Sequence, residues 1–202
     1  MQNIGTVEDR MFQFQQLFSG LKTVHDLGFL HGDIKLENIF MRKKRMFLAD
    51  FGGACHKDVE VKNLTELVAG EGSRATTEMY SNDFDQEESC ERAENGDREG
   101  VIEVERKRDV FALGCVLFMA LTGVNPFQQV GNPRTFVGFP DKIPIEGIPQ
   151  ELKDLIVKML DPEFSSRPDL DTAFNAFNEI LHSKFEQVAQ EIEEIKQQEG
   201  YE

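Results

Sequence analysis

The sequence predicts a mainly α-helical fold with one small β hairpin. Apolar residues recur every three or four positions over roughly residues 8–27, after Pro149 and again from Leu170, which is the spacing of helices with one buried face. Two short apolar stretches flank the basic residues 42–45, a pattern typical of two strands joined by a turn. These observations indicate several helices around a common core, with little sheet.

Composition limits the class of protein. The chain has 202 residues, of which 40% are hydrophobic, and this is enough for one packed domain or one large subdomain. The net charge of −15 argues against nucleic-acid or anionic-membrane binding and favours basic protein partners. No apolar run is long enough to span a membrane, and Met1 to Arg10 lack the basic and apolar parts of a signal peptide.

The cysteines indicate the compartment. Cys55, Cys90 and Cys115 are odd in number and have no metal-ligand spacing. This usage suits a reducing environment, so we expect a cytoplasmic protein, with secretion into a host cell left open. Cys55 closely follows a motif discussed below and could be reactive, although a quiet thiol explains it as well.

The first helix ends just before a candidate functional segment. Its inner face is formed by Phe14, Leu17, Phe18, Leu21 and Val24. Gly28 follows as a plausible C-terminal cap. Residues 38–41 then read as one strand, 42–45 as a basic turn and 46–49 as a second strand.

The most specific motif is the run 31–38 followed by Asp50-Phe51-Gly52. Phosphoryl transfer from a nucleotide needs a carboxylate near the attacking hydroxyl, oxygen ligands for Mg²⁺ and a cation near the moving phosphoryl group. The residues present at this spacing that meet these needs are Asp33, Lys35, Asn38 and Asp50. A hairpin between Asn38 and Asp50 would bring the two close enough to share metal ions.

This spacing resembles the catalytic loop and metal-binding motif of eukaryotic-type Ser/Thr protein kinases, and specifically their C-terminal lobe. The resemblance implies that Asp33 is the catalytic base and that Lys35 contacts the transferred phosphate. It also implies that Asn38 and Asp50 bind Mg²⁺ and ATP and that Phe40 lies beneath the adenine ring, although ordinary strand packing explains Phe40 equally well.

The resemblance also implies structural roles. His31 and Phe51 are expected to pack in the core, and Thr77 to bond with the catalytic Asp and Lys in a substrate-docking position. Asp109, at the start of an apolar helix running to about Leu121, is expected to accept backbone N–H groups near His31 and Gly32.

Arg167, in Ser166-Arg167-Pro168, matches the family's arginine that pairs with a buried acid at the end of the activation segment. The Ala-Pro-Glu sequence that closes this segment in the family is not recognisable here. Asp83, Asp85 and Glu87 are therefore all left open as the partner of Arg167.

The resemblance divides the chain into two parts. Residues 1–182 correspond to the lobe, with the catalytic loop at 31–38, the activation segment at 50–84 and an acidic insertion at about 85–105. The insertion is dense in Asp and Glu, and we expect a flexible loop. Residues 183–202 are expected to form a helical acidic tail with a heptad-like seam.

Besides the missing Ala-Pro-Glu, the sequence departs from the family at two places. Gly32 replaces the arginine that normally reads a phosphate on the activation loop, so loop phosphorylation is not expected to be the switch. We find no Gly-rich loop, strand lysine or helix glutamate of an N-terminal lobe, so the resemblance covers only part of a kinase domain. Truncation, a gene-model error or a split gene would each explain this.

These features imply a protein serine/threonine kinase that uses ATP and Mg²⁺ on protein substrates, with a regulatory or N-terminal-lobe-supplying partner. Two alternatives remain open. A lone lobe could act as an inactive scaffold. A small-molecule phosphotransferase would explain His-Gly-Asp, although enzymes of that class generally lack Lys35 and the long activation segment.

Overall fold

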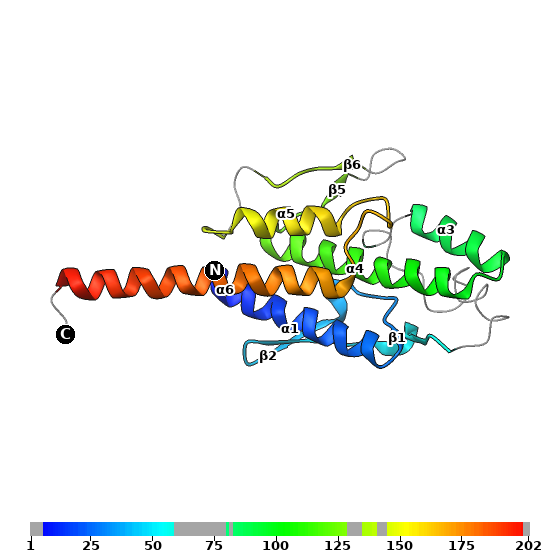
Figure 1. Cartoon of the computed structure of the whole chain (residues 1–202), viewed down its shortest axis with the longest axis horizontal. Coiled ribbons are helices and arrows are strands. Elements are labelled where there is room, and N and C mark those ends of the chain that lie inside the picture. The colour runs from blue at the N-terminus through cyan, green and yellow to red at the C-terminus, as the bar shows by residue number, and fades with distance from the viewer. Residues whose placement is uncertain (1–5, 59–79, 81–82, 129–134, 141–144, 200–202) are drawn as a thin grey trace.

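A computed structural model describes residues 6–58, 80, 83–128, 135–140 and 145–199. Its helices form the body of the molecule, and short strands lie along its sides (Figure 1). Two-stranded antiparallel sheets are formed by β1 with β4, β2 with β3 and β5 with β6. The prediction of a mainly helical fold with a small hairpin is confirmed.

Helix α1 spans Val7–Asp26, close to the range expected from the sequence. The Thr6 side chain accepts a hydrogen bond from the backbone N–H of Asp9, which satisfies one of the free donors at the helix start. Gly28 follows the C-cap with φ +81°, a left-handed conformation that glycine adopts without strain. A tight turn here directs the chain into β1, Phe29–Leu30, which pairs with β4, Cys55–His56.

The predicted hairpin is present, displaced by one residue at each strand. Strand β2 is Ile39–Arg42 and β3 is Arg45–Leu48, with Phe40 opposite Phe47 and Arg42 opposite Arg45. The two turn residues, Lys43 and Lys44, have φ of 50° and 65°. This is the primed two-residue turn that usually contains Asn and Gly, because both positions need a positive φ.

The acidic segment is helical, so the expectation of a flexible loop was wrong. Helix α3 is Asp83–Glu94, and α4 runs from Arg98 to Thr122, beginning well before Asp109. Helix α3 packs against the first part of α4 (Figure 1). Buried apolar residues that the acidic composition hid explain this packing: Val101, Ile102 and Val104.

The core forms where α1, α4, α5 and α6 meet. Helix α5 is Gln150–Met159 and α6 is Leu170–Glu199. A Cβ atom added at Gly114 on α4 would lie 3.0 Å from Cβ of Met159, so glycine there lets α4 and α5 approach closely. The remaining strands are β5, Phe127–Gln128, and β6, Thr135–Phe136. Within the described residues, no helix is both long and apolar enough to cross a membrane.

Candidate active site

The segment 31–38 is attached to the core through Asp109 on α4. The carboxylate of Asp109 accepts hydrogen bonds from the backbone N–H of His31 at 2.8 Å and of Gly32 at 2.9 Å. The Nε2 atom of His25, on α1, lies 2.9 Å from the same carboxylate. Burial opposes ionisation of Asp109, but these hydrogen bonds and His25 outweigh it and hold its pKa below the ordinary value.

Gly32 has the backbone that this attachment needs. Its φ is +75°, in the left-handed region, and its N–H points at Asp109. A glycine adopts this conformation at no steric cost.

The side chains of Asp33, Lys35 and Asn38 meet directly after the two residues that Asp109 binds. Lys35 Nζ lies 2.7 Å from Asp33 Oδ2, and Asn38 Nδ2 donates to the same oxygen at 2.9 Å and to the Asp33 carbonyl at 2.8 Å. Asp33 Oδ1 is buried and has no hydrogen-bond partner in the part of the chain that the structure describes. One oxygen of Asp33 is therefore fixed by two side chains, while the other is buried without a partner among the described residues.

The 3₁₀ turn η1, Leu36–Asn38, joins this cluster to the hairpin, and η2, Phe51–Gly53, follows the hairpin. The backbone N–H of Ala49 donates to the Asn38 carbonyl at 2.9 Å, which brings Asp50 back beside Asn38. Asp50 has φ 61°, and its carboxylate accepts from the N–H of Gly52 at 3.3 Å. A non-glycine residue in this strained backbone often marks a functional position.

The aromatic residues of the motif differ in burial. His31 is fully buried and its ring centroid lies 4.9 Å from that of Phe51. Phe51, however, is 50% exposed, so the expectation that it packs in the core was wrong. Phe40 is 60% exposed on the hairpin. Thr77 lies outside the described residues.

Sequence reasoning missed two residues that support this cluster. His25 contacts Asp109, and the buried Tyr80 accepts a hydrogen bond from the backbone N–H of Leu36 at 3.3 Å. Burial raises the pKa of the Tyr80 hydroxyl. The signal for His25 was a histidine on the buried side of an amphipathic helix; Tyr80 lies in a mixed-polarity segment without a periodic signal.

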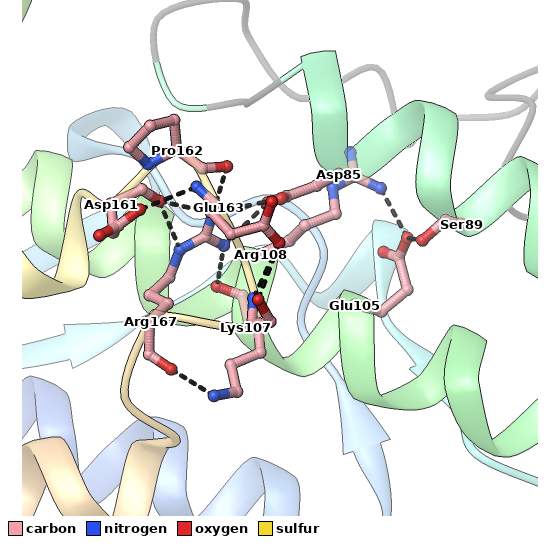
Figure 2. Close-up of polar contacts among 10 residues, drawn as sticks. Asp85, Ser89, Glu105, Lys107, Arg108, Asp161, Pro162, Glu163 and Arg167 are labelled. Atoms are coloured by element: carbon pink, nitrogen blue, oxygen red, sulfur yellow. Dashed lines mark hydrogen bonds and ion pairs between the residues drawn. The ribbon is translucent and has the colours of Figure 1, made fainter.

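Arg167 pairs with Asp85, one of the three acids that the sequence left open. Both side chains are buried, and two hydrogen bonds of 2.8 and 3.1 Å join them (Figure 2). Arg167 also donates to the carbonyls of Lys107 and Asp161. The pair thus connects α3, α4 and the loop between α5 and α6.

Comparison with known proteins agrees with this arrangement. A protein-family profile described as "Protein kinase domain" matches residues 3–185. The chain belongs to the protein kinase family. This is the family that the sequence motif indicated.

Several protein kinases are similar to this kinase chain. "Testis-specific serine/threonine-protein kinase 3" of Mus musculus is 25% identical over 164 residues, which cover 78% of this chain and 53% of that protein. "Serine/threonine-protein kinase PDK1" of Cryptococcus neoformans is 31% identical over 163 residues, covering 77% of this chain and 12% of that protein. The chain thus spans about half or less of the length of these relatives.

The kinase site offers hard oxygen ligands. Both hydrogen bonds from the Asn38 side chain come from Nδ2, which leaves Oδ1 as an acceptor. Asp50 directly follows Ala49, whose N–H donates to the Asn38 carbonyl. Mg²⁺ is commonly bound by one or two such protein oxygens together with phosphates and water, so these residues fit it. Among the described residues there is no cluster of three or more His, Cys, Asp or Glu side chains that could hold a metal without further ligands.

Proposed function

We propose that this chain is the C-terminal lobe of a protein serine/threonine kinase that transfers the phosphoryl group of ATP to protein hydroxyls. The observation that supports this most directly is that the two carboxylate oxygens of Asp33 differ in their hydrogen bonds. Lys35 and Asn38 hold Oδ2, and Oδ1 is left unpartnered among the described residues. A general base must come within hydrogen-bond reach of the proton that it accepts, and Oδ1 is the oxygen of Asp33 that still lacks a hydrogen bond among the described residues.

The roles of the other residues follow from the same geometry. Lys35 is close enough to Asp33 to contact the transferred phosphate, and a lysine two residues after the aspartate favours Ser/Thr substrates in this family. Asn38 Oδ1 and Asp50 would hold Mg²⁺, which neutralises phosphate charge when bound. The exposed Phe40 would support the adenine ring, and Thr77 would contact the docked substrate.

The proposal extends to partners and compartment. We include a regulatory protein, or one that supplies the residues that hold ATP from above in this family, among the partners of this chain. The three cysteines are odd in number and have no metal-ligand spacing, which supports a reducing compartment such as the cytoplasm.

Nucleotide binding tests the proposal on this chain. Titration with ATP in the presence of Mg²⁺ should show binding that chelation of Mg²⁺ removes and that Asp50→Asn weakens. Asp58→Asn, the same change on a nearby exposed residue outside the cluster, should bind like the unaltered chain. ATP binding that is unchanged both by chelation of Mg²⁺ and by Asp50→Asn would refute the assigned metal site.

Transfer distinguishes the remaining alternatives. In a form of the protein that phosphorylates a basic protein substrate, Asp33→Ala should abolish transfer and leave ATP binding largely intact. Loss of binding in Asp33→Ala would mean that the role of Asp33 is wrong. Mg-ATP binding without transfer in any form would favour the scaffold, and transfer to aminoglycosides or choline instead would favour a small-molecule phosphotransferase.

A further inference from the structure

A strongly basic turn stands out on this acidic molecule. Residues 42–45 contribute four of the 22 lysines and arginines, and all four are exposed, in a chain of net charge −15. Their positions make the hairpin less stable. Lys43 and Lys44 occupy positions of positive φ, and Arg42 lies directly opposite Arg45, where like charges repel. The four cations therefore need an explanation other than stability of the turn.

An acidic helical stretch begins close to this turn. Residues 186–194 of α6 contain four glutamates and no lysine or arginine. Lys184, at the start of the stretch, lies 3.7 Å from Glu8 of α1, and Lys44 of the basic turn lies 3.3 Å from the neighbouring Asp9. The first turn of α1 thus separates the basic turn from the acidic stretch.

Beyond its start, the acidic stretch leads away from the basic turn of its own chain. Helix α6 leaves the body here and extends away from it (Figure 1). At 1.5 Å of rise per residue, Glu194 lies about 15 Å beyond Lys184 along the helix axis. Glu191 and Glu194 are exposed, and Ile192 between them is 49% exposed.

An apolar spot lies between the two charged surfaces. Phe12, one helical turn after Asp9, is 47% exposed, and its ring centroid lies 4.8 Å from that of Phe185 on α6. Protein interfaces commonly have an apolar centre with a polar and charged rim. The basic turn, the exposed ring of Phe12 and the start of the acidic stretch therefore all adjoin the first two turns of α1.

We propose that this region of the molecule binds a second copy of the chain, with the basic turn of each copy against the acidic stretch of α6 of the other. A two-fold axis near Phe12 makes both contacts at once, because the same two surfaces meet twice in such an interface. The pairing is local, since the whole chains repel each other; at about 0.15 M salt, repulsion beyond about 8 Å is screened while direct ion pairs persist.

Sedimentation velocity from micromolar to sub-millimolar concentration tests this proposal. The chain should form a dimer at about 0.15 M salt and dissociate at about 1 M. Lys43→Glu/Lys44→Glu and Glu191→Lys/Glu194→Lys should each raise the dissociation constant at least about tenfold. An equimolar mixture of the two variants should associate again, because each basic surface then meets an acidic one.

Controls separate this pairing from general charge effects and from misfolding. Glu91→Lys/Glu94→Lys makes the same change of charge at the same spacing on exposed residues of α3, and should associate like the unaltered chain. Lys43→Asn/Lys44→Gly places the favoured residues in the turn and removes its central cations, so it should fold and associate weakly. A monomer throughout, or a mixture that fails to associate, would overturn the proposal.

Discussion

At the scale of single residues, Asp109 is the point through which the core orders the segment 31–38. Its carboxylate is almost fully buried, yet it accepts from two backbone N–H groups and contacts His25. A neutral amide in its place cannot accept both N–H bonds with the same strength, because hydrogen bonds to charged acceptors are the stronger ones.

Asp109→Asn should therefore lower the free energy of unfolding at neutral pH by about 1–3 kcal/mol. The pKa of Asp109 is depressed in the folded state, so its contribution is present above the unfolded-state pKa of about 3.9 and is lost as pH falls through the folded-state value. Urea unfolding at several pH values should show the gap between the two proteins closing in acid. The exposed Asp26→Asn provides the control, and a gap of constant size would contradict this account.

Both side chains of the Asp85–Arg167 pair are buried, and the stability of the fold depends on the presence of both. Burial raises the pKa of Asp85, and Arg167 offsets part of that effect through two hydrogen bonds. Removal of the arginine leaves a buried carboxyl group without its main counter-charge, which is more costly than replacement of both partners by apolar groups.

Arg167→Met should accordingly lower the free energy of unfolding by about 3–5 kcal/mol. The double variant Asp85→Leu/Arg167→Met should lose clearly less than the sum of the losses of Asp85→Leu and Arg167→Met. Burial raises the folded-state pKa of Asp85 above its unfolded value, and loss of Arg167 raises it further, so the Arg167→Met protein should gain stability as pH falls through that folded-state pKa. Thermal and urea unfolding of the four proteins measure both effects. Additive losses would show that the two side chains are not coupled.

At the scale of elements, the basic hairpin turn stores strain. Lys43 and Lys44 both have a positive φ, which costs non-glycine residues free energy. Lys43→Asn/Lys44→Gly should raise the free energy of unfolding by about 1 kcal/mol, because Asn-Gly adopts this turn with little strain. Lys43→Ala/Lys44→Ala removes the same charges without relieving the backbone and should bring no such gain. Equal stabilisation by both variants would attribute the effect to charge repulsion instead.

Sequence patterns predicted some elements well and others poorly, for physical reasons. Apolar spacing and end signals located α1 and α5 within about one residue, as is expected where Gly28 and Pro149 mark helix ends. The same reasoning failed at α3 and the first part of α4, because the acids there face solvent or ion-pair partners such as Arg92 and Arg108. Composition alone does not show which face of a helix is buried.

The residues of the candidate site were likewise predicted in part. Asp33, Lys35, Asn38 and Asp50 stand in one motif of fixed spacing, so the sequence could bring them together. His25 and Tyr80 contact the motif only through the tertiary fold, at sequence separations of 84 residues from Asp109 and 44 from Leu36. No local pattern reports contacts of that kind.

At the scale of the whole molecule, the helices form one core, and the hairpin with its site residues lies on that core. Residues of α1, α4, α5 and α6 share a single buried cluster, whereas Phe40 and Met41 of β2 are mostly exposed. A two-stranded hairpin with an exposed face is marginally stable by itself. The helices should therefore open only in global unfolding, and the hairpin by local opening at lower cost.

Hydrogen exchange with a core variant tests this division. Phe177 of α6 is fully buried against Phe18 of α1, and Phe177→Ala should lower the global free energy of unfolding by about 3–5 kcal/mol. The slowest amides of α1 and α4 should then exchange faster by the same factor, because both depend on global unfolding. Amides between β2 and β3 should change little, since their exchange is already limited by local opening. Faster exchange of the α1 amides without the α4 amides would show that the helices do not unfold as one unit. Helix α1, which carries His25, would then open independently of α4, which carries Asp109.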